Sequence, residues 1–177
     1  MPFVFLLGGA RSGKSATAKR FAIQAGAPVT FIATAEPMDD EMATRIQRHR
    51  DERPADWRTV ESPIDLHAAV TSAPAGDFLI VDCLTLWVSN LLAAGRSAEQ
   101  IISAAEVVAH ELEGRHCVVV SNEVGLGIVP VNELARAYRD VLGGVNSTFA
   151  ESADRALLMV AGRTLDLTTA EDLVRGD

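Results

Sequence analysis

The residues best suited to chemistry are the eight of GGARSGKS, Gly8 to Ser15. They fit the pattern G-x-x-x-x-G-K-[ST] and stand between a predicted strand, residues 3–7, and a predicted helix, residues 14–25. Glycines let backbone N–H groups approach phosphate oxygens, and the start of the helix adds a partial positive charge. Lys14 can reach the β- and γ-phosphates of a nucleotide, and the Ser15 hydroxyl can bind Mg²⁺. The motif predicts a nucleotide-binding P-loop formed by Gly8, Gly9, Ala10, Arg11, Ser12, Gly13, Lys14 and Ser15. The alternative is a chance glycine turn before a helix.

A second candidate is Asp82, the last residue of the apolar run FLIVD, residues 78–82. An apolar strand that ends in an acid is the usual form of a Walker B strand. Its carboxylate holds Mg²⁺ through water. The alternative is that Asp82 caps a helix over residues 84–92.

A third candidate is His49, which stands among four arginines in the segment 39–57. On a helix, one column of side chains is Glu41, Arg45, His49 and Arg53, and the neighbouring apolar edge is Met38, Met42 and Ile46. Nearby positive charges disfavour imidazolium, so His49 is expected to stay neutral and nucleophilic near neutral pH. The arginines can hold phosphates with paired hydrogen bonds, and the combination suits attack on a phosphorus atom. The alternative, which the spacing alone favours, is a solvated helix with salt bridges from Glu41 and Asp51.

A fourth candidate is the segment SNEVGLGIVP, residues 121–130. It follows a predicted buried strand, so Asn122 and Glu123 are expected at the carboxyl end of the sheet, where ligands bind in open α/β folds. Glu123 can position a hydroxyl or order the waters of a metal. An ordinary glycine loop is the alternative.

These candidates need a scaffold, and the hydrophobic pattern predicts one. Strands are expected at residues 3–7, 29–33, 78–82, 117–121, 156–161 and 164–167, and helices at residues 14–25, 39–53, 64–71, 97–113 and 132–142. Apolar strands separated by helices predict a mostly parallel sheet covered on both faces. The length of 177 residues suits a single domain, residues 1–177.

Composition narrows the function classes. The formal net charge of −8 repels a polyanion, so we expect no general nucleic-acid partner. Two cysteines, Cys83 and Cys117, lie in apolar stretches and form neither a metal cluster nor a disulfide framework. Buried free thiols, together with the lack of a leader or a membrane-length apolar run, predict a soluble cytoplasmic protein without a membrane partner.

The motifs together resemble the bifunctional adenosylcobinamide kinase/adenosylcobinamide-phosphate guanylyltransferase family of cobalamin biosynthesis. The resemblance covers almost the whole chain. It is carried by residues 8–15, 32–63 (IATAEPMDDEMATRIQRHRDERPADWRTVESP), 81–92 (VDCLTLWVSNLL) and 121–146 (SNEVGLGIVPVNELARAYRDVLGGVN). The P-loop alone is unspecific, whereas the histidine segment and the SNEVG loop together are very specific.

The resemblance implies a RecA-like P-loop NTPase fold and a covalently guanylylated histidine, which corresponds to His49. It places guanine nucleotide contacts on the P-loop and on a further set of residues: Ala33, Thr34, Ala35, Arg50, Asp51, Glu52, Arg53, Glu61 and Asp82. It also implies Mg²⁺, held by Ser15 and Asp82, with GTP and ATP as nucleotide substrates, adenosylcobinamide as the other substrate, and a homo-oligomer, specifically a trimer. Without nucleotide, His49 can lie far from the P-loop.

Other classes make different demands on the sequence. A plain P-loop small-molecule kinase needs Lys14 and Asp82 but not His49. A guanine-nucleotide switch is expected to have an N/T-K-x-D motif, which the sequence lacks. A RecA-like motor is expected to have a basic surface for nucleic acid, which the acidic composition opposes.

Overall fold

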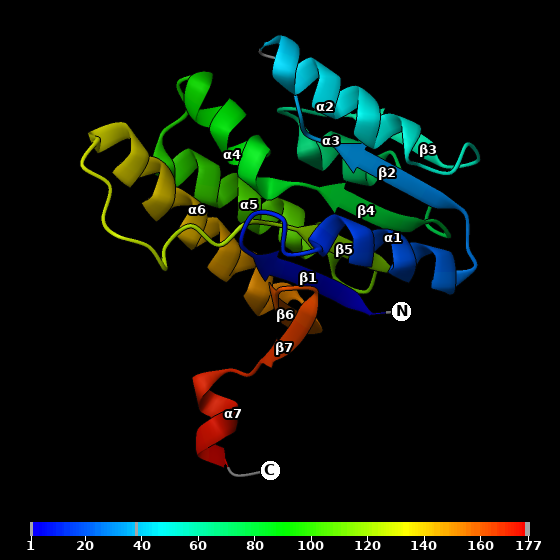
Figure 1. Cartoon of the computed structure of the whole chain (residues 1–177). Helices are drawn as coiled ribbons and strands as arrows, with labels where there is room; N and C mark the ends of the chain where they lie inside the picture. The colour runs from blue at the N-terminus through cyan, green and yellow to red at the C-terminus, as the bar shows by residue number, and fades with distance from the viewer. Residues whose placement is uncertain (1, 38, 176–177) are drawn as a thin grey trace.

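The computed structural model describes residues 2–37 and 39–175, which form one sheet with helices on both faces (Figure 1). The strand order is β3-β2-β4-β5-β1-β6-β7. All neighbouring strands are parallel except β6 and β7, which form an antiparallel hairpin. The strands are β1 Phe3–Gly8, β2 Val29–Ala33, β3 Arg58–Glu61, β4 Phe78–Asp82, β5 Cys117–Val120, β6 Arg155–Val160 and β7 Arg163–Leu167. The mostly parallel α/β fold predicted from the sequence is confirmed.

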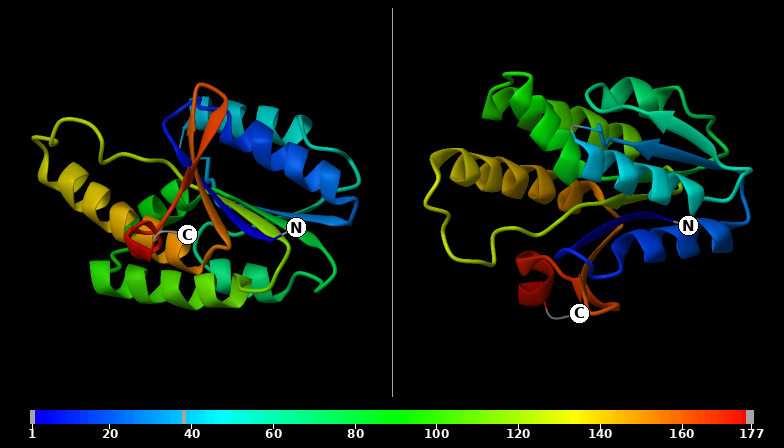
Figure 2. Two further views of the ribbon diagram at one scale, coloured as in Figure 1. Left: turned by 90° about the horizontal axis from the view of Figure 1, so that it is seen from below. Right: turned by 45° about the horizontal axis from the view of Figure 1, so that its top comes forward.

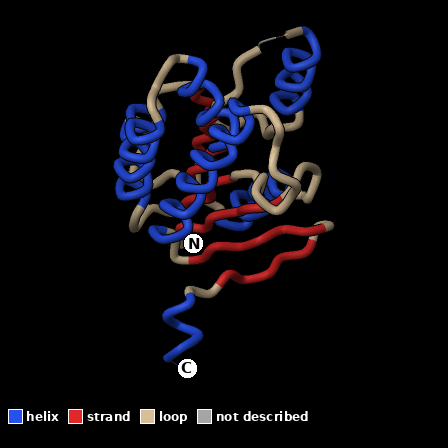
Figure 3. Tube along the Cα trace, turned by 90° about the vertical axis from the view of Figure 1, so that its left-hand side faces the viewer, coloured by secondary structure: helices blue, strands red, loops and turns tan. Residues whose placement is uncertain are grey.

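The helices divide between the two faces of the sheet (Figure 2). They are α1 Lys14–Ala25, α2 Asp40–Asp51, α3 Leu66–Thr71, α4 Leu84–Ala93, α5 Ala98–Leu112, α6 Glu133–Ser152 and α7 Ala170–Arg175. Helices α1 and α2 lie on one face, and α3, α4, α5 and α6 lie on the other. The short α7 lies beyond the edge strand β7 (Figure 3). None of the helices in the described part of the chain is both long and apolar enough to cross a membrane.

Alternation along β1 shows how one strand serves two cores. Phe3 and Phe5 pack with apolar residues of α3 to α6, whereas Val4 and Leu6 pack with Ala18 and other residues on the α1 face. All four side chains are at most 3% exposed. Successive side chains of a strand point to opposite faces, so a continuous apolar run lies between two layers of helices.

Apart from shifts of one or two residues at the ends of elements, the structure differs from the sequence prediction at three places. Strand β3 was not predicted, because RTVE has no apolar run and lies at the sheet edge. Helix α6 continues to Ser152 instead of ending at Leu142, and a Cβ on Gly144 would lie 2.7 Å from Ile102 Cδ1 of α5. Glycine there permits close packing of two helices. Helix α7 was also not predicted.

Candidate nucleotide site

The functional candidates meet at the carboxyl edge of the sheet. Strand pairing aligns Ala33 with both Glu61 and Asp82, and aligns Asp82 with Val120. Leu6, two residues before the P-loop begins, also pairs with Val120. The ends of β3, β2, β4, β5 and β1 therefore form one row, which is where open parallel sheets bind ligands.

The P-loop connects β1 directly to α1. Gly8 is the last residue of β1, and Lys14 and Ser15 are the first two residues of α1. A Cβ on Gly8 would lie 2.4 Å from the carbonyl oxygen of Met159, so only glycine fits against the neighbouring strand β6. The strand–loop–helix arrangement predicted around the motif is confirmed.

Lys14 is embedded in the loop, with 6% of its surface exposed. Its Nζ donates hydrogen bonds to the carbonyl oxygens of Gly8 and Gly9, both at 2.8 Å. Burial lowers the pKa of Lys14, and the carboxylate of Asp82 opposes this by favouring the charged form. The loop thus holds a positive charge within its own backbone.

A cavity of about 110 Å³ brings three of the candidate residues together. Ser15 comes from α1, Asp82 from the end of β4 and His49 from α2. The rest of the lining is Ala16, Lys19, Phe31 and Glu52. His49 therefore lines the same cavity as Ser15 and Asp82, whereas the sequence analysis had allowed it to lie far from the P-loop.

Three contacts hold the C-terminal end of α2 against the rest of the site. Lys19 of α1 pairs with Glu52 at 3.1 Å, and Arg50 pairs with Glu61 at the end of β3. The Arg53 guanidinium lies over the ring of Phe31, 3.8 Å from its centroid. Burial lowers the pKa of Arg53, and the negative charge of Asp82 opposes this by favouring the charged guanidinium.

The half-buried positions of α2 and of Arg53, just beyond its end, explain how His49 reaches the cavity. Met42, Ile46, His49 and Arg53 are half-buried, and Glu41 and Asp51 are exposed. Met42 and Ile46 of the apolar edge thus face the rest of the fold, and His49 lies on the same side of the helix about one turn after Ile46. Met38, which the sequence prediction placed on this edge, lies outside the described residues.

Asp82 does not cap the following helix. The N-cap residue of α4 is Cys83, and its side chain makes no capping hydrogen bond. The end of β4 is tied instead to the end of β2: the Thr34 hydroxyl donates to the Cys83 carbonyl at 2.7 Å and accepts from the Cys83 amide at 2.9 Å. Thr34 is fully buried, so it acts here by fixing the backbone beside Asp82.

The other residues implied by the family resemblance are not all at this cavity. Ala33 is buried at the end of β2 and Ala35 is half-buried in the loop after it. Asp51 is exposed, and its carboxylate accepts a hydrogen bond from Gln47 at 2.7 Å on the outer side of α2. Asp51 is thus directed away from the cavity that His49 lines.

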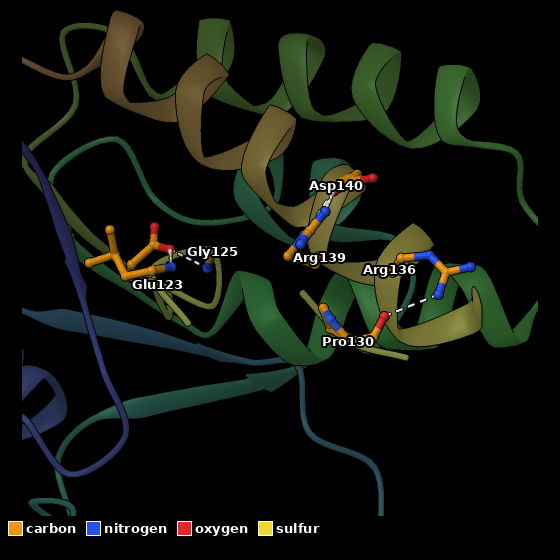
Figure 4. Close-up of polar contacts among 7 residues, drawn as sticks. Glu123, Gly125, Pro130, Arg136, Arg139 and Asp140 are labelled. Atoms are coloured by element: carbon orange, nitrogen blue, oxygen red, sulfur yellow. Dashed lines mark hydrogen bonds and ion pairs between the residues drawn. The ribbon is translucent and has the colours of Figure 1, made fainter. Parts of the chain in front are cut away.

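The SNEVG segment forms a loop that Glu123 stabilises (Figure 4). The Glu123 carboxylate accepts hydrogen bonds from the backbone amides of Gly125 and Leu126, and the Glu123 amide donates to the Gly8 carbonyl at 3.1 Å. Asn122 receives support from Thr85, whose hydroxyl accepts from the Asn122 amide at 2.9 Å. In this geometry Glu123 shapes its own loop at the edge of the P-loop.

Lys19 is the site residue that the sequence analysis missed. It lies one helical turn after Ser15, lines the cavity and pairs with Glu52. Lys14 and Lys19 are the only lysines of the chain. The occurrence of both lysines within residues 14–19 was the only signal in the sequence that Lys19 belongs to the site, because no motif includes this second lysine.

Comparisons with known proteins place this geometry in context. A family model described as cobinamide kinase / cobinamide phosphate guanyltransferase matches residues 4–167. The chain is 46% identical to the bifunctional adenosylcobalamin biosynthesis protein CobP of Pseudomonas aeruginosa, over 92% of this chain and 95% of that protein. It is 43% identical to the bifunctional adenosylcobalamin biosynthesis protein CobU of Salmonella typhimurium, over 90% of this chain and 96% of that protein.

A solved structure supports the fold. The assembled ATPase EscN of the type III secretion system of enteropathogenic E. coli matches with a TM-score of 0.57 at 12% identity, over 98% of this chain and 50% of that chain. At this identity the likeness concerns the fold alone. It agrees with the P-loop NTPase architecture expected from the sequence.

Proposed function

The chain belongs to the cobinamide kinase / cobinamide phosphate guanyltransferase family, and from this premise we propose that His49 carries the guanylyl group in its second reaction. The chain is a bifunctional kinase and guanylyltransferase of cobalamin biosynthesis. The observation that supports the role of His49 is the shared cavity, in which this histidine faces the same space as Ser15 and Asp82. A plain kinase has no need of a histidine there.

The first reaction moves a γ-phosphoryl group from a nucleoside triphosphate to the hydroxyl of the aminopropanol arm of adenosylcobinamide. The transfer is direct and needs positioning and charge neutralisation more than covalent chemistry. Lys14, held inside the loop, neutralises charge on the β- and γ-phosphates. The backbone amides of the loop and the start of α1 hold the same phosphates by hydrogen bonds.

The second reaction transfers GMP in two steps. The imidazole of His49 attacks the α-phosphorus of GTP, the bond to the β-phosphate oxygen breaks and pyrophosphate leaves. The phosphate group of adenosylcobinamide phosphate then attacks the phosphoramidate, which gives adenosylcobinamide-GDP and frees His49. A histidine intermediate divides one difficult transfer into two easier ones.

Cations around the cavity suit this chemistry. Lys19 lines the cavity, and Arg53 lies on Phe31, whose ring is also part of the lining. The Nε of Arg53 is buried with no hydrogen-bond partner among residues 2–37 and 39–175. A guanidinium with an unused donor beside the site is suited to hold a phosphate oxygen of the bound nucleotide.

Mg²⁺ fits the donor groups at this cavity. Ser15 offers a hydroxyl and Asp82 a carboxylate, and Mg²⁺ binds through one or two such oxygens plus phosphate and water. When bound, the ion supplies neutralisation of charge on the phosphates. The two side chains hold their positions because Ser15 belongs to the first turn of α1 and Asp82 ends the buried strand β4.

We expect Asp82→Asn to impair both reactions, because it removes the metal-binding carboxylate while keeping the size of the side chain. The measurement is the Mg²⁺ dependence of each activity, which should shift to higher Mg²⁺ concentration. Asp77→Asn is the matched control: Asp77 accepts a hydrogen bond from Thr30 at the other end of the sheet. An unchanged Mg²⁺ dependence in Asp82→Asn would leave Asp82 without a metal role.

The proposed function is tested most directly by incubating the protein with Mg²⁺ and GTP labelled at the α-phosphate. A phosphoramidate is labile in acid and stable in base, so the label should stay on the protein in base and leave it in acid. A protein that phosphorylates adenosylcobinamide but never takes up this label would be a kinase only. Phosphorylation of adenosylcobinamide by the same preparation, measured with ATP and with GTP in turn, identifies the phosphate donor of the first reaction.

We further propose that the chain forms a homo-oligomer, specifically the trimer that its family resemblance implies. The loop between β5 and α6 extends from the body of the fold (Figure 1). It presents Ile128 and Val131, each 97% exposed, and burial of such side chains favours association.

Sedimentation equilibrium should give three times the chain mass of 18.9 kDa. The double variant Ile128→Ser, Val131→Ser should weaken the assembly, whereas Val107→Ser on α5 should not; a wild-type monomer contradicts the proposal.

A further inference from the structure

The β6–β7 hairpin contacts the P-loop at its beginning, middle and end. At the beginning, Gly8 pairs with Met159 in the parallel ladder of β1 and β6. In the middle, the amide of Gly162 donates a hydrogen bond to the carbonyl of Ser12 at 2.9 Å. At the end, a Cβ on Gly13 would lie 3.5 Å from Gly162 Cα and 3.7 Å from the Met159 methyl group. The turn of the hairpin stands beside the P-loop (Figure 2).

The hairpin turn is built to present the Gly162 amide. Val160 and Arg163 pair across the ladder, so the turn has two residues, Ala161 and Gly162. Both have left-handed backbones, with φ of 50° and 75°. Two successive positive φ values are typical of a type I′ turn, which matches the twist of the strands it joins. Arg155 pairs with Asp166 further along the two strands and supports the hairpin.

The hydrogen bond to Ser12 has a consequence for the next amide of the P-loop. In a trans peptide unit the C=O and N–H groups point in opposite directions. Because the Ser12 carbonyl is directed toward the hairpin, the Gly13 N–H of the same peptide is directed away from it. The Ser12 side chain is buried at 7% exposure, which limits rotation of this part of the loop.

We propose that Gly162 is a positioning residue for nucleotide binding: its amide fixes the Ser12–Gly13 peptide so that the Gly13 N–H is presented to the phosphates. The C-terminal hairpin is then part of the phosphate-binding apparatus and not only an edge of the sheet. The inference rests on the proposed binding of triphosphates at the P-loop. It adds a contact that no sequence motif contains, since 150 residues separate Ser12 from Gly162.

The test compares two glycines with nearly identical backbones. Gly162 has φ +75° and Gly114, in the turn between α5 and β5, has φ +73°, and a Cβ at either position meets no atom within 4 Å. Valine at each position introduces the same backbone strain. We expect both Gly162→Val and Gly114→Val to lower the melting temperature, but only Gly162→Val to raise the Kd for GTP. The expected rise is about tenfold, the size of the loss of one orienting hydrogen bond.

A rescue variant separates positioning from general damage. Asparagine tolerates a left-handed backbone and keeps the N–H, so Gly162→Asn should bind GTP like the wild type. If Gly162→Val does not fold, the milder pair Gly162→Ala and Gly114→Ala gives the same comparison. A Kd for GTP that is equal in the wild type and in the folded valine or alanine variant of Gly162 overturns the inference, and so does an equal rise in the matched variants of Gly162 and Gly114. Lys14→Ala is measured in the same series. If it loses GTP binding while the Gly162 variants give either of these results, the P-loop still binds the triphosphate and only the positioning role of Gly162 is wrong.

Discussion

Replacing Lys14 with alanine is expected to weaken triphosphate binding at least about 100-fold and to abolish kinase activity, the scale seen when one preorganised charge donor is removed. Lys14 is the only lysine of the P-loop, and its Nζ lies within hydrogen-bonding distance of two loop carbonyls. Titration calorimetry with GTP and with ATP measures the affinity, and phosphorylation of adenosylcobinamide measures the activity. Arg20→Ala is the matched control, because it removes an exposed cation from the same helix.

The pH dependence of binding gives a second readout of Lys14. Burial lowers its pKa, so the positive charge is lost at a lower pH than in an exposed lysine. Triphosphate affinity should therefore fall as the pH rises through the lowered pKa, at a lower pH than for an exposed lysine. The alanine variant should lack this alkaline loss. Equal affinity and equal turnover in the wild type and in Lys14→Ala would mean that the P-loop does not bind the triphosphate.

The parts of the fold that the sequence predicted best are those in which one strong local signal decides the structure. Helix α1 and strands β2 and β4 have the bounds expected from their apolar runs and flanking residues. Every residue of β2 and all of β4 before Asp82 are buried, and α1 buries one side, so tertiary contacts reinforce the local pattern. The P-loop was predictable for the same reason: its motif specifies both the loop and the elements on either side.

The parts that could not be predicted depend on contacts between distant residues. The helix predicted to end at residue 142 continues through Gly143 and Gly144 to Ser152, and the side chain of Ile102 of α5 packs close to Gly144. Helix α2 ends at Asp51 and not at Arg53, and Arg53 turns over the ring of Phe31 on β2. The inclusion of Lys19 in the cavity follows from its pairing with Glu52, which the sequence of either helix alone does not indicate.

His49 shows both sides of this limit. Its spacing alone favoured a solvated helix, whereas the neighbouring arginines and the family resemblance both suggested a nucleophile. The structure adds that His49 is half-buried on the inward side of α2, at a cavity shared with Ser15 and Asp82. The arrangement of three elements, and not the helix pattern, gives the hypothesis its physical basis.

Replacing His49 with alanine is expected to abolish covalent guanylylation and guanylyltransferase activity while leaving measurable phosphorylation of adenosylcobinamide. The γ-phosphoryl transfer is direct and needs no protein nucleophile, whereas transfer of GMP is proposed to pass through the imidazole. Covalent label from α-labelled GTP and the rates of the two reactions are measured on the same preparation. His49→Asn is the companion variant, because it keeps a polar side chain without a nucleophilic nitrogen.

The control for this prediction is His110→Ala on α5. The His110 side chain is 83% exposed and pairs with Glu113 on the far face of the sheet, so its removal should leave label uptake unchanged. Label that remains on the His49→Ala protein would move the nucleophile to another residue, and the candidates would be His67, His110 and His116. Equal loss of both activities would assign His49 to nucleotide seating, since the kinase reaction has no use for a nucleophile. Loss of the label with retention of phosphorylation is the outcome that identifies His49 as the residue that holds GMP.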